Sequence, residues 1–277
     1  MRIMKKIYYL FMSMTVILLA ACSQDEMEQV KEGTLPELRV MVNHPSSIAT
    51  RASIDTTSTS FENGDTIGIF VVGPDGNPMN KNVAYVYNGT KWILANKSDK
   101  VYYSSDFSYY AYYPYVVKED EDVWYSLVTF YMDAPTEFFK DFISSWEPLL
   151  DQSTLKNFNH SDLMIGKGTN LNETASVSFT LEHQMGLVRL SYFNWDTDSV
   201  VKDISGMDSK RYFYDENDED RDCPIPYNTG KNFFHYIAKP GTTFEFVCSG
   251  PLGFDVHSVP VDASEGFITY YTIVPTN

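Results

Sequence analysis

Apolar and polar residues alternate along most of this chain, in short runs separated by turn-forming residues. Leu38, Val40 and Val42 alternate with Arg39 and Met41, the period expected of a half-buried strand. Clusters of Gly, Pro, Asn and Asp end each run before it becomes long. Many short strands of this kind predict an all-β fold made of sandwiches. We expect strands at residues 38–42, 67–72, 83–87, 92–94, 107–115, 123–132, 177–181, 187–193, 233–238, 243–248 and 266–274.

One segment departs from this period of two. Its apolar residues fall at helical spacing: Phe138, Phe139, Phe142, Ile143 and Trp146. Thr136 is a candidate N-cap and Pro148 would end the helix. We expect one short helix that covers the end of a sheet, although a helix that binds a partner would show the same pattern.

The polar stretch HSDLMIGKGTNLNET separates two β patterns in the chain of 277 residues. A mature chain of this length suits two domains of ordinary size. We therefore expect one β-sandwich at residues 35–170 and a second at residues 171–277.

The N-terminus has the order of an export signal. Three basic residues come first, residues 7–19 are apolar, and Ala20-Ala21 then leads into Cys22. The apolar run is too short for a membrane-spanning helix. Leu19-Ala20-Ala21-Cys22 resembles the bacterial lipobox, in which the cysteine is lipidated and becomes the first mature residue. We predict a lipoprotein signal peptide at residues 1–21; a plain secretory signal with an incidental cysteine is the alternative.

Charge narrows the choice of partners. Residues 22–34 form an acidic tether, whose start resembles the surface-display signal of Bacteroidetes lipoproteins, although a tether of arbitrary charge would look the same. The formal net charge of the chain is −16, so the surface repels nucleic acid and anionic headgroups. A lipidated Cys22 would anchor the protein to outer-membrane lipid without spanning the membrane.

The motifs of common enzymes are absent from the sequence. We find no G-x-S-x-G, H-E-x-x-H or C-x-x-C, and the five histidines are scattered. We predict no catalytic residue and no cofactor. Asp218, Asp220 and Asp222 are weak calcium ligands at best, because Asp220 stands where the calcium loop needs glycine. A solvated acidic loop explains them better.

Two further features leave alternatives open. Cys223 and Cys248 could form one disulfide in an exported chain, but their spacing does not demand it. The segment YYAYYPY at residues 109–115 could stack on sugar rings, or its tyrosines could pack between sheets. We favour packing for most of them.

Several stretches occur in an order typical of one family: the lipobox, "ATRAS", "FENGDTIGIFV", "YVYNGTKW", "YYAYYPY", "HSDLMIGKG" and "VSFTLEHQMGLVRL". This order resembles the fimbrillin family of Bacteroidetes, the Mfa-like pilus subunits and related surface lipoproteins. The resemblance extends from Cys22 to about Leu190.

The resemblance implies two tandem transthyretin-like β-sandwiches and assembly into type V pili on the cell surface. In that family an arginine- or lysine-specific protease removes the first strand, and a strand from a neighbouring subunit fills the groove by donor-strand exchange. Arg51 occupies the matching cleavage position, and Leu38, Val40 and Val42 would belong to the removable strand. The implied partners are other pilus subunits, an arginine-specific protease and a host or glycan ligand.

The apolar run at residues 266–274 is expected to be the last strand of the second sandwich. No separate donor strand follows it in the sequence. We therefore expect a tip or accessory subunit that serves adhesion. The alternative is a surface glycan-binding lipoprotein of a nutrient-uptake system.

Overall fold

The computed structural model describes residues 35–43, 61–117, 120–194, 199–213, 223–250, 253–262 and 268–274. The chain divides into two compact units, Met1–Pro36 and Glu37–Asn277, and every helix and strand reported below lies in the second. None of the described helices is long and apolar enough to cross a membrane.

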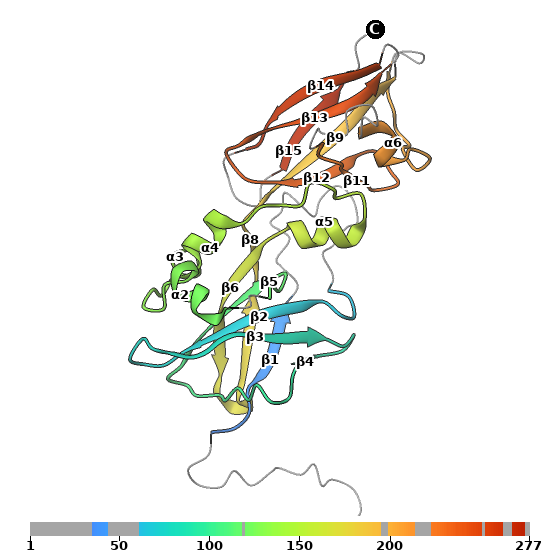
Figure 1. Ribbon diagram of the computed structural model, residues 1–277. Coiled ribbons are helices and arrows are strands. Elements are labelled where there is room, and N and C mark those ends of the chain that lie inside the picture. Colours follow the sequence, from blue (N-terminus) through green and yellow to red (C-terminus); the bar gives the residue numbers. More distant parts are fainter. Residues whose placement is uncertain are drawn as a thin grey trace, which may run out of the picture. The chain divides into compact units, whose positions relative to one another are not determined.

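Eight strands form the first sheet, in the order β1-β7-β6-β5-β2-β3-β4 with β8 beside β6 (Figure 1). Neighbouring strands are antiparallel, except that β1 runs parallel to β7. The strands β1 and β4 end this order and contact each other. The bounds are β1 (Arg39–Asn43), β2 (Thr66–Val72), β3 (Pro78–Tyr87), β4 (Trp92–Leu94), β5 (Ser108–Tyr113), β6 (Met164–Leu171), β7 (Ser176–Thr180) and β8 (Glu182–His183).

β2 has no polar side chain from Ile67 to Val72, because both of its faces are buried there. Ile67, Ile69 and Val71 point into one cluster, which we call the inner core. Phe70 and Val72 point to the opposite face, into a second cluster, the outer core. The inner core also includes Leu38, Val40, Tyr85, Trp92, Tyr109, Tyr113, Val177 and Phe179, and the outer core includes Tyr110, Tyr112, Trp124, Val128, Phe130, Phe138, Phe139, Phe142 and Phe158.

Short helices supply four of the nine buried aromatic residues of the outer core: Trp124, Phe138, Phe142 and Phe158. The helices are α2 (Trp124–Leu127), α3 (Pro135–Phe138), α4 (Lys140–Ser145) and α5 (Leu155–Ser161), with 3-10 turns η1 (Glu121–Val123) and η2 (Asn172–Thr174). The helix expected from the aromatic spacing is present as α3 and α4, interrupted at the fully buried Phe139. The strand expected at residues 123–132 is wrong, because Trp124, Val128 and Phe130 reach the outer core from a helical turn and a loop.

The second sheet has the order β10-β9-β12-β11, with β15 paired to β9. A separate hairpin of β13 and β14 packs over it, and α6 contacts β13. Between them lies the third core, which includes Val188, Leu190, Phe213, Phe234, Phe246, Cys248 and Val259. The bounds are β9 (Gly186–Asn194), β10 (Ser199–Val200), α6 (Ser209–Phe213), β11 (Tyr227–Asn228), β12 (Phe234–Ala238), β13 (Thr243–Gly250), β14 (Gly253–Pro260) and β15 (Ile268–Ile273).

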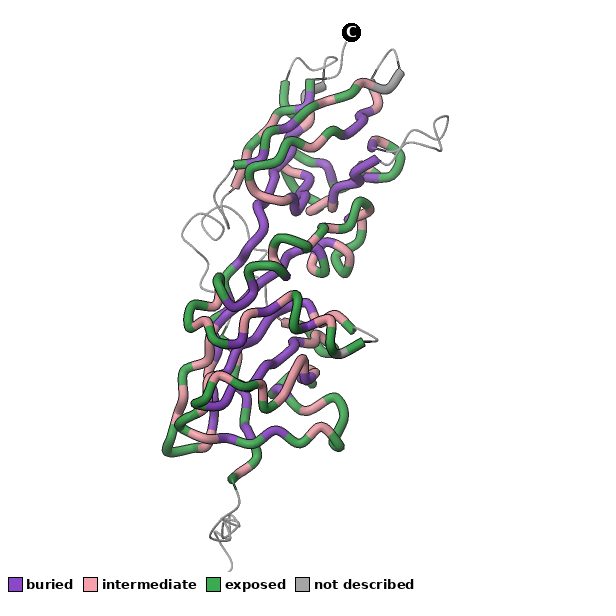
Figure 2. Tube along the Cα trace, turned by 60° about the vertical axis from the view of Figure 1, so that its left-hand side comes forward, coloured by how far each residue is buried: buried purple, intermediate pink, exposed green. Residues whose placement is uncertain are grey.

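The predicted all-β class is confirmed, although the described residues hold five short α-helices where the sequence predicts one. β2, β5 and β12 are buried along nearly all of their length. Figure 2 shows how buried and exposed stretches alternate along the chain. The boundary expected between residues 170 and 171 falls inside the first sheet, because β7 and β8 pair with β6. The polar stretch that suggested it, residues 160–174, contains β6. Gly168 makes room there for β7, since a Cβ at this position would lie 2.2 Å from Cγ1 of Val177.

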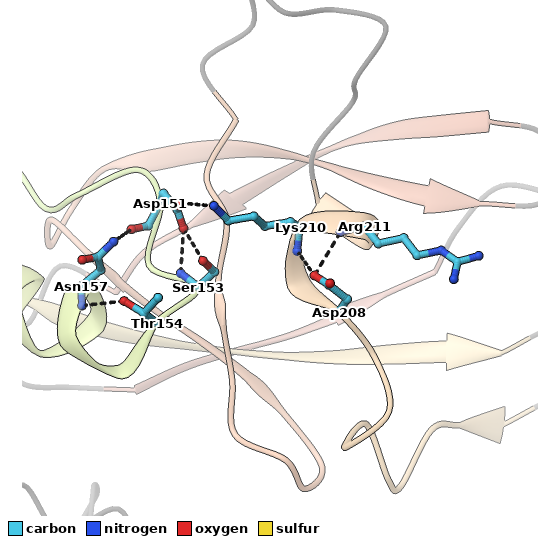
Figure 3. A network of polar contacts seen from close by, with 7 residues as sticks. All are labelled: Asp151, Ser153, Thr154, Asn157, Asp208, Lys210 and Arg211. Carbon is cyan, nitrogen blue, oxygen red and sulfur yellow. Dashed lines mark hydrogen bonds and ion pairs between the residues drawn. The ribbon is translucent and has the colours of Figure 1, made fainter.

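The segment between α4 and α5 forms hydrogen bonds with the second sheet. Gln152 is fully buried; its Nε2 donates to the carbonyl of Ile237 and its Oε1 accepts from the amide of Ile237, both at 2.8 Å. Beside it, Asp151 Oδ2 lies 2.8 Å from Nζ of Lys210, and Asp151 Oδ1 accepts hydrogen bonds from Ser153 (Figure 3). These contacts connect the helical segment to β12 and α6.

Candidate functional site

The first strand is an edge strand of the first sheet. Among the described strands, β1 lies at the end of the first sheet and pairs with β7 alone, in a parallel register from Arg39↔Ser176 to Asn43↔Thr180. Just before β1, the amide of Leu38 donates to the carbonyl of Val101 at 2.9 Å, and Glu37 forms a single bridge with Tyr102. The strand is therefore a terminal edge strand with one full ladder of hydrogen bonds.

The alternation predicted for β1 is confirmed. Leu38 and Val40 are 7% and 6% exposed and belong to the inner core, and Val42 packs against it. Arg39, Met41 and Asn43 are exposed on the other side. At the end of the strand, Nδ2 of Asn43 donates to hydroxyl oxygens on β7. One face of β1 is thus buried in the inner core, whereas the other face is exposed.

Without β1, the fold would contain a groove with the features of a strand-binding site. Its wall would be the unpaired edge of β7, and its floor would include Val177 and Phe179, which are fully buried when β1 is present. An unpaired edge beside apolar pockets is a template for another strand with alternating apolar side chains.

The chain continues from β1 into a segment that lies outside the described residues. Since β1 ends at Asn43 and the described chain resumes at Phe61, residues 44–60 are the only covalent link between β1 and the rest of the fold. Phe61 secures the far side of this link: its ring packs edge-on against Trp92 at 5.1 Å and Tyr113 at 5.5 Å. Arg51, the expected cleavage site, and Cys22, the expected lipidation site, lie outside the described residues.

The tyrosines at residues 109–113 do not form an exposed platform, and the packing interpretation is confirmed. Tyr109, Tyr110, Tyr112 and Tyr113 are between 0% and 4% exposed. Their hydroxyls donate inside the fold; Tyr112, for example, donates to Oδ1 of Asn82 at 2.6 Å. Burial raises the pKa of Tyr109 and of Tyr110 to about 12. These rings cannot stack on a sugar without unfolding the sheet.

The structure corrects the disulfide that the sequence allowed. Cys223 and Cys248 are both buried, and both are free thiols. Cys248 points into the third core, where burial, with a contribution from Asp255, raises the pKa of its thiol to about 12. Asp218, Asp220 and Asp222 lie outside the described residues. Within the described ranges, no group of three or more His, Cys, Asp or Glu residues could hold a metal ion.

Some buried polar residues that organise the fold carry no local signal in the sequence. Gln152 and the pair formed by Asp162 and His183 are examples; Oδ2 of Asp162 lies 2.8 Å from Nδ1 of His183, and both residues are buried. A third example is Arg189, which is 2% exposed in β9. Their partners lie far away along the chain, so only the folded structure reveals them.

Comparison with known proteins supports a relationship with fimbrial proteins. The profile of a family described as fimbrillin-like matches residues 50–210, more than half of the chain. A fimbrial protein from Bacteroides ovatus has a similar structure, with a TM-score of 0.57 and 21% identity over 88% of this chain and 49% of its own. This chain thus spans about half the length of that protein.

A second structure, of a protein proposed to act in cell adhesion in Bacteroides ovatus, has a TM-score of 0.52 and 12% identity. The match covers 87% of this chain and 92% of that one. At these identities the two structures establish similarity of fold. No curated protein sequence matches the chain.

Proposed function

Because this chain belongs to the fimbrillin-like family, we propose that it is a surface subunit of a type V pilus that serves adhesion. It is exported as a lipoprotein, held in the outer membrane through lipidated Cys22, and contributes structure and binding without catalysis. The two similar structures, a fimbrial protein and a protein proposed to act in cell adhesion, support this assignment.

The proposed assembly by strand exchange rests on the position of β1. It is an edge strand with one full partner, it buries Leu38 and Val40, and it is joined to the fold only through residues 44–60. An arginine-specific protease that cuts at Arg51 would free this strand while Phe61 holds the new end in place. A strand from another subunit would then enter the groove beside β7.

The energetics favour replacement of the strand over an empty groove. Fully burying an aliphatic side chain stabilises a protein by roughly 1.5–3 kcal/mol, so Leu38 and Val40 together contribute roughly 3–6 kcal/mol. This is a large fraction of the 5–15 kcal/mol of stability typical of a domain. A subunit that has lost β1 is therefore driven to accept another apolar strand.

We further propose a tip or accessory position. The last described strand, β15, pairs with β9 over six residues and buries Ile273. It is thus part of its own sheet, and the subunit acts as an acceptor of a strand. The alternative role in glycan uptake gains no support from the tyrosine segment, whose rings are buried.

Limited digestion with trypsin tests this function. We expect early cleavage after Arg51, whereas Arg39, which lies in the β1 ladder, stays uncut. The cut protein should form oligomers that native mass spectrometry detects. The Arg51→Gln variant should not be cut at that position and should stay monomeric. Absence of early cleavage at Arg51, or protein cut at Arg51 that stays monomeric at high concentration, would rule the proposal out.

A further inference from the structure

Arg189 is a buried cation that forms no ion pair with another described residue. It lies in the middle of β9, is 2% exposed, and is among the largest fully buried side chains of the described residues. Its Nε is buried and has no hydrogen-bond partner among the described residues. Burial of an unpaired charge costs several kcal/mol, so this arrangement needs an explanation.

Two aromatic rings flank the guanidinium group. Its carbon lies 5.8 Å from the ring centre of Phe233 and 5.7 Å from that of Tyr270, and Nη1 donates to the Tyr270 hydroxyl at 3.3 Å. Such cation–π contacts recover about 0.5–2 kcal/mol. They hold the guanidinium from the sides and leave Nε without an acceptor.

The neighbouring positions on the same face carry hydroxyl groups. Arg189 is in register with Tyr270, and Ser191 is in register with Thr272, two residues farther along both strands. Ser191 Oγ lies 2.9 Å from Thr272 Oγ1. Tyr270 is 54% exposed and Thr272 is also exposed. A cation, an exposed ring and a hydroxyl pair thus lie about 7 Å apart or less along one face.

We propose, resting on the adhesive role above, that this face binds a carboxylated sugar, a sialic or uronic acid at the end of a glycan. The carboxylate pairs with Arg189 and gives Nε its acceptor, since planar guanidinium groups match carboxylates in geometry. The sugar ring stacks on Tyr270, whose exposed side chain turns away from Nη1 to admit the carboxylate. Sugar hydroxyls bond to Ser191 and Thr272.

Overall charge favours a small acidic ligand over an acidic protein. The chain carries a formal net charge of −16, which repels a polyacidic partner much more than a ligand with one carboxylate. The site lies on the second sheet, whereas β1 and its groove belong to the first. Binding of the sugar therefore does not require strand exchange.

Calorimetric titration of the full chain tests the assignment, with 3′-sialyllactose against lactose and glucuronic acid against glucose. We expect at least one acidic sugar to bind and its neutral counterpart not to bind. Tyr270→Ala should weaken binding at least about tenfold, because the stacking ring is lost. Tyr131→Ala removes another exposed tyrosine, 79% exposed in the native chain, and should leave binding unchanged. Equal binding of neutral and acidic sugars would overturn the assignment.

Arg189→Met separates a binding role from a structural one. Loss of the charged hydrogen bonds should weaken binding of the acidic sugar at least about tenfold. The melting temperature should not fall, because the unpaired buried charge disappears while the length of the side chain is kept. A variant that binds the sugar as well as the native chain would contradict the proposal. The proposal would also be contradicted if a polyglutamate peptide bound at Tyr270 and no acidic sugar bound there.

The Arg51→Gln variant distinguishes this inference from the assembly function. It cannot be cut at that position, yet it should bind the acidic sugar as the native chain does. If no sugar binds but cut protein forms oligomers, the ligand assignment alone is wrong. If sugar binds and no oligomers form, the assembly function alone is wrong.

Discussion

Val40→Ala is the substitution that tests most simply how firmly β1 is held. Val40 is 6% exposed and belongs to the inner core, whereas the adjacent Met41 is 44% exposed on the opposite face. Removal of two buried methyl groups costs about 0.8 kcal/mol for each, plus a cavity contribution, or about 1.5–3 kcal/mol in total. Because β1 is a terminal edge strand, this loss should appear first as local detachment of the strand.

Trypsin cleavage at Arg39 reports that detachment. In a chain that also carries Arg51→Gln, the native β1 ladder protects Arg39, and its cleavage rate follows the population in which the strand is open. Since about 1.4 kcal/mol corresponds to a factor of ten, Val40→Ala should speed cleavage at least about tenfold.

Met41→Ala provides the matched control for Val40→Ala, because it shortens an apolar side chain on the exposed face of the same strand. Substitutions at such surface positions usually change stability by less than about 0.5 kcal/mol. Its cleavage rate should therefore stay within about threefold of the native rate. If Met41→Ala accelerates cleavage as much as Val40→Ala does, the assignment of the two faces of β1 is wrong.

Three further predictions concern the core and the connecting segment. Gly168→Ala would place a Cβ 2.2 Å from a methyl carbon of Val177 and should cost about 1–3 kcal/mol in a denaturant titration; Gly206→Ala, which meets nothing within 4 Å, should cost less than about 0.5 kcal/mol. Cys248, whose thiol pKa is raised to about 12 by burial, should react with Ellman's reagent at least about a hundredfold more slowly in the native chain than after unfolding; similar rates would contradict its burial. Burial alone would raise the pKa of Asp151, but hydrogen bonds from its lysine and serine partners lower it. The stability that Asp151 adds over Asp151→Asn should thus be present above about pH 4 and disappear as the pH falls through the lowered pKa; a difference that persists at pH 2 would refute this.

Local sequence patterns were sufficient to predict the strands in which buried and exposed side chains follow a regular order. The alternation at residues 38–42 and the continuous apolar run at residues 67–72 predict β1 and β2, because each side chain's environment follows from the pleat. β6 escaped prediction because Gly166 and Gly168 replace apolar residues where β7 packs closely. Residues 123–132 were wrongly expected as a strand, since aromatic rings that fill the outer core from a helix and a loop resemble strand alternation.

The strand-binding site beside β7 was also predictable only in part, because local patterns do not show which distant strands pair. The sequence identifies Leu38 and Val40 as the buried residues of the first strand, but it does not show that β7 is their parallel neighbour, far along the chain. Pairing between distant strands leaves no local mark. Arg189 illustrates the limit most clearly, because a charged residue in an alternating strand would be expected to face water, yet its face is covered by aromatic rings.

Hydrogen exchange in β7 tests the central claim most directly. After verified cleavage at Arg51, the amides of Ser176–Thr180 that face β1 should exchange faster, because their partner strand can leave. Addition of a peptide with the sequence of residues 35–43 should restore their protection, whereas the same peptide with Asp at the positions of Leu38 and Val40 should not. If these amides stay protected after cleavage, or if both peptides act alike, β1 is not an exchangeable strand.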